Sequence, residues 1–173
     1  MSPERRRAIQ AIVDRLLDFF QISIPVDLEN LVVQLGGKIN YTSLESDLDG
    51  LIQKVGFAFQ ISIDNNKPKS RNNFTIAHEL GHLFLHMGFL IDDDKWNSLV
   101  DFKDSYARKG FSLQESEANE FAACLLMPKN LFIKKCYELE QNGKVDVSKL
   151  SEYFSVSADA AEMRGKWLGL FSW

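Results

Sequence analysis

The sequence predicts an α+β domain that is mostly helical and carries one small sheet beside a histidine-bearing helix. Apolar residues recur at helical spacing in both terminal thirds of the chain, and a short central stretch alternates apolar and polar residues as half-buried strands do. The 173 residues are 45% apolar, which is enough material for a core. We expect one domain over residues 1–173, with an N-terminal helix at 1–21, a core at 22–128 and C-terminal helices at 129–173.

The first two elements are expected to be helices. Ser2 followed by Pro3 is typical of a helix start, and the amphipathic run that follows continues to about residue 20. Charged residues interrupt this run and no small-residue cleavage site follows it, so we do not interpret it as an export signal. A second helix is expected after Pro25, stopped by the Gly36-Gly37 pair.

Three short strands are expected next, at residues 38–41, 50–55 and 57–63. The third alternates smaller or polar residues with large apolar ones, which predicts a shared buried face for Phe57, Phe59, Ile61 and Ile63. A polar loop over residues 65–71 then leads to the histidine helix.

The rest of the chain is expected to be helical, apart from one weak segment. Helices are predicted at about 73–86, 115–127, 129–142, 147–153 and 158–168. Between them, residues 87–114 give a weak signal and are expected to be partly irregular. The run Asp92 to Asp94 in that segment is interpreted as a solvated acidic turn and not as a set of metal ligands.

The stretch "AHELGHLFLH" contains all three histidines of the chain, four residues apart. On a helix, residues four apart lie on one face about 6 Å apart along the axis, so His78 and His82 can bind one ion. Zinc accepts such nitrogen ligands. Glu79 then lies beside the metal, where it can accept a proton from a water that the metal makes acidic.

Apolar residues surround this motif on nearly every side, which predicts a buried helix. Buried histidines and a buried glutamate need partners, and a metal supplies them. His86 continues the row, but it lies about 12 Å along the axis from His78, so one ion cannot bridge the two. We expect His86 at the helix end or at the edge of the core.

A carboxylate should complete the site, because catalytic zinc sites use three protein ligands and keep one position open. In "ESEANEFAACLLMP", Glu115 and Asn119 share a helical stripe with small alanines. These alanines and Gly81 allow the two helices to cross closely, which would bring Glu115 to the metal. Asn119 is expected to hydrogen-bond a ligand histidine.

Glu117 and Glu120 are the rival carboxylates on the same helix. They lie about 200° and 140° around the helix axis from Glu115, away from the alanine stripe. We therefore interpret both as solvent-facing charges.

The stretches "RNNFTIAHELGHLFLH" and "ESEANEFAACLLMP" together resemble the ImmA/IrrE family of metallopeptidases. The resemblance also includes "DGLIQKVGFAFQISID" and "LSEYFSVSADAAEMRGKWLGL", and it covers residues 22–170. It implies a zincin-like, gluzincin-type fold, one Zn²⁺ per chain held by His78, His82 and Glu115, and Glu79 as the catalytic glutamate. The Glu-x-x-x-Asn spacing is similar to the Glu-x-x-x-Asp of thermolysin-like zinc peptidases.

The resemblance also implies a biological setting. Members of the family are cytosolic, often belong to mobile elements or stress-response circuits, and several cut or inactivate a helix-turn-helix repressor. It therefore implies a cytoplasmic endopeptidase whose protein substrate is an Xre-type helix-turn-helix repressor. Extended peptide substrates commonly pair with an edge strand of such a sheet.

Two rival functions remain open at this point. Residues 148–170 have the outline of a DNA-reading helix-turn-helix in which Ser157 caps the second helix. Asp159 and Glu162 at the start of that helix have the wrong charge for DNA, and the net charge of −4 gives no broad basic footprint, so we expect no nucleic-acid partner. No apolar run approaches the length of a membrane span, so we expect no membrane partner either. A metal-binding antirepressor or sensor that does not cut its partner is the second rival.

Two further interpretations concern single residues. An oxyanion needs a donor, and Tyr106 or Arg108 could supply it, with ordinary surface side chains as the alternative. Cys124 and Cys136 form no Cys-x-x-Cys pair and are interpreted as free thiols in a reducing compartment.

Overall fold

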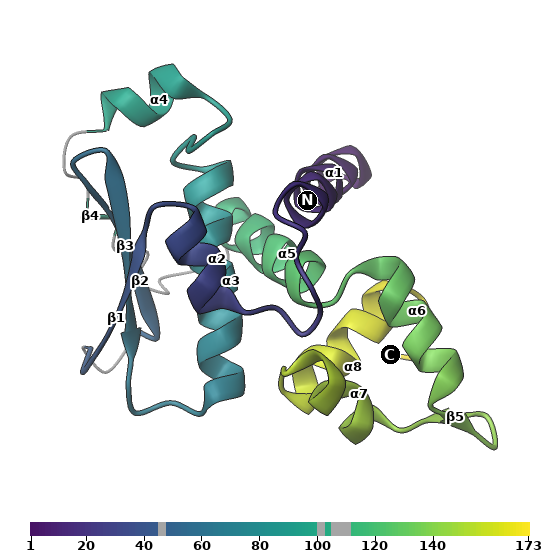
Figure 1. Ribbon diagram of the computed structural model, residues 1–173. Helices are drawn as coiled ribbons and strands as arrows, with labels where there is room; N and C mark the ends of the chain where they lie inside the picture. Colours follow the sequence, from purple (N-terminus) through teal and green to yellow (C-terminus); the bar gives the residue numbers. More distant parts are fainter. Residues whose placement is uncertain (45–47, 100–102, 105–111) are drawn as a thin grey trace.

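The computed structural model describes residues 1–44, 48–99, 103–104 and 112–173 (Figure 1). The described residues form an α+β fold that is mostly helical with a small mixed sheet, as predicted. In chain order the elements are α1 (Pro3–Phe19), α2 (Leu28–Gln34), β1 (Lys38–Thr42), β2 (Gly50–Val55), β3 (Ala58–Asp64), α3 (Lys69–Leu85), α4 (Asp93–Ser98), β4 (Lys103–Asp104), α5 (Leu113–Leu126), α6 (Lys129–Glu138), β5 (Glu140–Gln141), β6 (Lys144–Val145), α7 (Val147–Phe154) and α8 (Ala158–Trp167).

The sheet lies beside α3, which carries the histidines (Figure 1). Its strand order is β1-β3-β2-β4, with β1 parallel to β3 and the other two pairs antiparallel. Ile52 of β2 pairs with Ile61 of β3, and both are fully buried. Phe59 and Ile63 share that face because side chains two apart in a strand point the same way.

The predicted face of β3 is wrong at one residue. Phe57 lies in the turn before the strand and is 93% exposed. The turn residue Gly56 has a positive φ of 61°, which reverses the chain there and takes Phe57 out of the strand alternation.

Three further elements differ from the prediction. Helix α3 begins at Lys69, inside the expected polar loop, because Pro68 can precede a first helical turn that needs no side-chain cap. Helix α4 occupies part of the segment expected to be irregular, and Asp92 caps it by accepting a hydrogen bond from Lys95 N at 3.0 Å. The helix expected to reach residue 142 ends at Glu138, and a hairpin of β5 and β6 follows.

The core continues from the sheet through α3 and α5 to the C-terminal helices. In Figure 1, α3 and α5 lie between the sheet and the group α6–α8, and α1 lies against α5. Ile9 and Val13 of α1 are fully buried, and so are Phe132, Leu150 and Ala161 of the C-terminal helices. Cys124 and Cys136 are buried free thiols.

The end of the chain has the predicted helix–turn–helix outline. Ser157 caps α8 by accepting a hydrogen bond from Ala160 N at 3.1 Å. Arg164 of α8 is buried, donates to the carbonyl of Met127 at 3.2 Å and pairs with Glu120 at 3.4 Å. Helix α8 therefore packs onto α5 and the segment after it, as expected.

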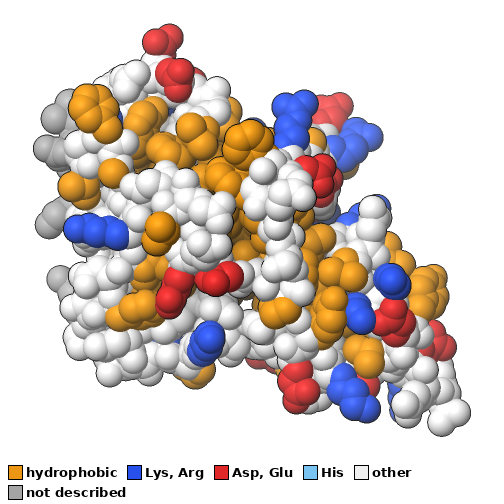
Figure 2. All heavy atoms as spheres, in the orientation of Figure 1, with side chains coloured by type: hydrophobic (Ala, Val, Ile, Leu, Met, Phe, Trp, Pro, Cys, Tyr) orange, Lys and Arg blue, Asp and Glu red, His pale blue; other side chains and the backbone are white. Residues whose placement is uncertain are grey.

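Charges of both signs occur on the molecular face drawn in Figure 2, between groups of hydrophobic side chains. Among the described residues, no helix is long and apolar enough to cross a membrane.

Candidate metal centre

The interior of α3 holds the first two candidate ligands. His78 and His82 lie on one face of this helix, and their Nε2 atoms are 2.9 Å apart. The opposite faces are buried by Ile76, Leu80 and Leu83, each at most 1% exposed. Hydrophobic packing on these faces fixes the rotation of α3 and so directs both imidazoles to one point.

Helix α5 brings the third candidate ligand to the same point. Glu115 Oε2 lies 3.3 Å from His78 Nε2, and Glu115 Oε1 lies 3.4 Å from His82 Nε2. The crossing that allows this is as close as the small residues predicted. A Cβ atom added to Gly81 would lie 2.9 Å from Ala118 Cα, so any side chain at Gly81 would separate the two helices.

These three side chains fit a zinc ion. One ligand atom from each of His78, His82 and Glu115 lies within 4.8 Å of the others. Tetrahedral zinc with nitrogen bonds of about 2.0–2.1 Å places its ligand atoms about 3.3–3.4 Å apart, which matches the two carboxylate distances, while the ring nitrogens are somewhat closer. Glu115 Oε1 is buried without a hydrogen-bond partner among the described residues, and a cation would satisfy it.

Asn119 contacts the His78 ring nitrogen that faces away from the candidate metal position. Its Oδ1 lies 2.9 Å from His78 Nδ1, the hydrogen bond expected from its position one turn after Glu115. Because an amide oxygen only accepts, His78 Nδ1 carries the hydrogen and Nε2 keeps its lone pair for an ion.

Glu79 is buried on the side of α3 that faces the start of β2. It is 4% exposed, and a Cβ added to Gly50 would lie 3.1 Å from its Oε1. The absence of a side chain at Gly50 therefore leaves room for this carboxylate. The negative charge of Glu79 is also close enough to act on the His78 ring.

The two histidines differ in their protonation. Burial, together with the neighbouring His78 and His86, lowers the pKa of His82 to about 2, so the His82 ring is neutral. Burial also acts to lower the pKa of His78, but Glu115 and Glu79 outweigh it and the pKa of His78 lies above its ordinary value. A proton on His78 consequently competes with a cation for the site.

His86 lies at the end of α3, as expected, but it also contacts a candidate ligand. Its Nδ1 is 2.8 Å from Nδ1 of His82, and its Nε2 is 3.1 Å from Oε2 of Glu117. Burial lowers the pKa of His86, although Glu117 opposes the shift. His86 is not part of the three-residue cluster.

The prediction that Glu117 faces solvent is wrong. Glu117 is 5% exposed and receives two hydrogen bonds from Arg5, at 2.8 and 2.7 Å, in addition to its contact with His86. Arg5 holds the pKa of Glu117 below its ordinary value against the opposing effect of burial. The prediction considered only the face of α5 that meets α3, whereas α1 covers a second face.

Glu120 is also not simply solvent-facing. Its side chain is 12% exposed and lies 3.2 Å from Arg6 Nε and 3.4 Å from Arg164 Nη1. Both rival carboxylates on α5 thus join helices together.

Two other groups of residues were considered from the sequence, the aspartate run and the possible oxyanion donors. Asp92, Asp93 and Asp94 are exposed at the start of α4, which agrees with an acidic turn. Tyr106 and Arg108, the candidate oxyanion donors, lie outside the described residues.

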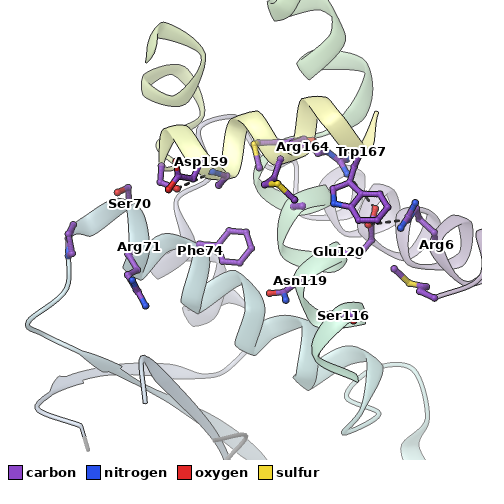
Figure 3. A pocket seen from close by; sticks show the side chains of 17 residues that line it. Arg6, Ser70, Arg71, Phe74, Ser116, Asn119, Glu120, Asp159, Arg164 and Trp167 are labelled. Carbon is purple, nitrogen blue, oxygen red and sulfur yellow. Dashed lines mark hydrogen bonds and ion pairs between the residues drawn. The ribbon is translucent and has the colours of Figure 1, made fainter. Parts of the chain in front are cut away.

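A cleft of about 860 Å³ lies between α3, α5 and α8, and one of its lining residues, Asn119, contacts His78 (Figure 3). Ser116 and Asn119 line it from α5. Phe74, one turn before His78, projects into the space from α3. The wall formed by α8 includes Met163 and Trp167. The cleft therefore offers an apolar surface that reaches Asn119, which contacts His78, although the three candidate ligands themselves are not among its lining residues.

The arginines that line the cleft are paired within the protein. Arg71 binds Asp49 at 2.8 Å, and Arg6 and Arg164 both pair with Glu120. These pairs leave the described charges of the cleft largely neutralised, which favours an apolar occupant.

Comparison with known proteins agrees with the resemblance noted from the sequence. Residues 38–166 match the IrrE N-terminal-like domain, a peptidase family designated M78. No curated protein sequence matches the chain. A solved structure, a Mycobacterium tuberculosis transcriptional regulator, is similar with a TM-score of 0.63 at 16% identity. The similarity covers 91% of this chain and 46% of that protein, so the chain spans less than half of its length and the likeness concerns the fold alone.

Proposed function

Since the chain belongs to the IrrE N-terminal-like family of peptidases, we propose that it is a zinc-dependent endopeptidase of the gluzincin type. The observation that carries this proposal is the convergence of His78, His82 and Glu115 with Glu79 buried beside them. Two histidines and one carboxylate form the ligand set of catalytic zinc sites that keep a position open for water or substrate.

We assign roles to five residues, of which three would bind the metal. His78, His82 and Glu115 would hold the ion, and Asn119 fixes the His78 ring. When bound, zinc supplies Lewis acidity, which makes a water molecule more acidic and a peptide carbonyl more electrophilic. Zinc is preferred to other divalent ions because of the nitrogen-rich ligand set.

Glu79 carries the proton in the proposed reaction. Its carboxylate accepts a proton from the attacking water, whose oxygen forms a bond to the peptide carbonyl carbon. The carbon–nitrogen bond then breaks, and Glu79 returns the proton to the leaving amine. The products are a carboxylic acid and an amine, which exchange the remaining proton of the water to give a carboxylate and an ammonium ion, and Glu79 ends in its starting state.

The cleft supports a protein substrate. It reaches Asn119, which contacts His78, and its apolar wall of Phe74, Met163 and Trp167 can hold apolar side chains of a bound polypeptide. The family resemblance implies an Xre-type helix-turn-helix repressor as that substrate, and we adopt this class as the candidate.

The proposal is tested by incubating zinc-loaded protein with a library of peptides and identifying fragments by mass spectrometry. Wild type should produce new amino termini, and a chelator should stop their formation. Glu79→Gln should retain one zinc per chain and lose hydrolysis by a factor of about 10² or more, since this is the smallest effect expected for a general acid–base residue. Equal hydrolysis by wild type and Glu79→Gln would refute the mechanism.

A non-cleaving regulator on the same fold is the second candidate. It is supported by the fold of the transcriptional regulator, although that likeness is limited to 16% identity. DNA binding is the weaker form of this candidate, because Asp159 and Glu162 are exposed at the start of α8 and would repel phosphates. Survival of the biological activity in Glu79→Gln would favour the non-cleaving regulator.

A further inference from the structure

A continuous chain of hydrogen bonds joins helix α1 to the candidate metal ligand His82. Arg5 of α1 donates to both carboxylate oxygens of Glu117, with Nε to Oε1 at 2.8 Å and Nη2 to Oε2 at 2.7 Å. Glu117 Oε2 lies 3.1 Å from His86 Nε2, and His86 Nδ1 lies 2.8 Å from His82 Nδ1. His82 Nε2 then faces His78 and Glu115. The described side chains of Glu117, His86 and His82 are all at most 7% exposed.

The direction of the hydrogens along this chain follows from its carboxylate end. A carboxylate only accepts hydrogen bonds, so His86 Nε2 must carry a hydrogen. In a neutral ring the other nitrogen then has a lone pair, and His86 Nδ1 accepts. The hydrogen between the two rings therefore belongs to His82 Nδ1, which leaves a lone pair on His82 Nε2.

We infer that Arg5, Glu117 and His86 are positioning residues that fix the tautomer and the orientation of His82 for metal binding. The inference rests on the proposed metal site, and it adds three residues that lie outside the His-Glu-x-x-His pattern and its third ligand. It also gives a function to α1, since Arg5 lies before residue 38, where the match to the peptidase family begins. Outer partners of this kind change metal affinity because a ring in the wrong tautomer presents a hydrogen to the ion.

The protein contains a second arginine–glutamate pair that provides closely matched controls. Arg6 follows Arg5 on α1 and pairs with Glu120, which lies one turn after Glu117 on α5. The Arg6–Glu120 pair also joins α1 to α5, but neither residue has a described contact with a histidine. Loss of either pair removes one link between the same two helices, while only the Arg5–Glu117 pair leads to His82.

The first test is zinc affinity, measured by competition with a chromogenic chelator. Glu117→Gln and Arg5→Gln are compared with Glu120→Gln and Arg6→Gln. A glutamine at 117 can donate as well as accept, so it permits the reversed chain in which His82 Nε2 carries the hydrogen. We expect Glu117→Gln to weaken zinc binding by about 10- to 100-fold, as found for outer partners of ligand histidines. Both controls should stay within about twofold of wild type; equal weakening in Glu117→Gln and Glu120→Gln would refute the inference.

The second test reads the tautomer directly in zinc-free wild type, so it needs no variant to fold. Long-range ¹H–¹⁵N correlation spectra distinguish a hydrogen on Nδ1 from one on Nε2. A hydrogen on Nδ1 of His82 and on Nε2 of His86 supports the inference, and a hydrogen on Nε2 of His82 overturns it. If wild type binds no zinc, the proposed function fails, whereas the tautomers still decide whether the hydrogen-bond chain has the inferred direction.

Discussion

Gly50 controls the room available to the Glu79 carboxylate. It lies at the start of β2, where an added Cβ would overlap Thr75 Cγ2 and lie 3.1 Å from Glu79 Oε1. We predict that Gly50→Ala displaces Glu79 and lowers the turnover of peptide substrates, while zinc content stays at one per chain. Zinc analysis and steady-state kinetics on the same preparation test this prediction.

Thr75→Ser provides the control, because it removes the methyl group that the new Cβ would meet. The double variant Gly50→Ala/Thr75→Ser relieves that overlap and leaves the contact with Glu79. Turnover should remain low in the double variant. Full recovery would mean that Thr75, and not Glu79, transmits the effect of the substitution.

Glu117 should make the stability of the protein depend on acidic pH. Its folded-state pKa lies below the ordinary value of 4.5, chiefly because of Arg5. The stabilisation is therefore complete above pH 4.5 and is lost as the pH falls through the folded-state pKa, since the unfolded state then binds the proton more strongly. We predict that the melting temperature of wild type falls more steeply below pH 4.5 than that of Arg5→Gln.

The comparison variant is Arg7→Gln, which changes an exposed arginine of the same helix. It should retain the steep acidic dependence of wild type. A parallel pH profile for wild type and Arg5→Gln would show that the Arg5–Glu117 pair does not stabilise the folded state.

Residue patterns in the sequence predicted the three candidate metal ligands, but they did not predict that Glu117 is buried behind them. Helical spacing singled out His78 and His82, and the stripe of small alanines singled out Glu115, because each lies on a helix whose geometry fixes relative positions. Glu117 was placed in solvent because its burial depends on α1, which lies more than 100 residues earlier in the chain. The available signal was the third histidine, since a buried His86 one turn after His82 requires an acceptor of its own.

At the scale of elements, the crossing of α3 and α5 is the part most sensitive to side-chain size. A Cβ at Gly81 would meet the backbone of Ala118, which cannot move aside as a flexible side chain can. We predict that Gly81→Ala destabilises the fold by about 1–3 kcal/mol through overpacking. The separation of the helices should also weaken zinc binding, because Glu115 moves away from both histidines. Chemical denaturation and chelator competition measure the two effects.

Whether Gly81→Ala raises or lowers the free energy of unfolding is informative, because helix propensity and overpacking have opposite effects on it. Replacing glycine by alanine inside a helix should by itself stabilise it by about 0.5–1 kcal/mol. A stabilised Gly81→Ala variant with unchanged zinc affinity would therefore contradict the close crossing.

Element types were largely predictable, whereas some boundaries were not. Amphipathic periodicity predicted α1, the spacing of histidines, glutamates and small residues predicted α3 and α5, and alternation predicted β3. The predicted helix over residues 129–142 wrongly included the start of the hairpin formed by β5 and β6, although Asn142-Gly143 is a strong two-residue hairpin signal. Both residues have positive φ, 52° and 75°, as that turn requires. Strands of two residues are too short to show an alternating pattern, so the sequence does not distinguish them from a continuation of the adjacent helix.

At the scale of the whole molecule, zinc binding and folding should be coupled. All three candidate ligands lie on helices that form the core, so the unfolded chain lacks the site. Zinc at 100 times its dissociation constant should stabilise the fold by about 2.7 kcal/mol. For a chain of this size, that corresponds to a rise in melting temperature of roughly 5–11 °C. Differential scanning fluorimetry with and without zinc tests the prediction.

Glu115→Ala should abolish most of this rise, because two histidines alone bind zinc weakly. Magnesium, which prefers oxygen ligands, should leave the melting temperature of wild type unchanged. An equal rise in wild type and Glu115→Ala would place zinc elsewhere on the protein.

The cap of α5 has a consequence for how long a metal ion stays bound. Ser112 accepts a hydrogen bond from Glu115 N at 3.1 Å, so the third candidate ligand belongs to the first turn of its helix, whereas His78 and His82 lie inside α3. Helix ends open far more often than helix interiors. Ion exchange should therefore begin with fraying of this turn and should not wait for global unfolding. Removal of the cap in Ser112→Ala costs about 1 kcal/mol, which corresponds to release into excess chelator that is about fivefold faster. The hydroxyl of one serine would thus set the residence time of the metal.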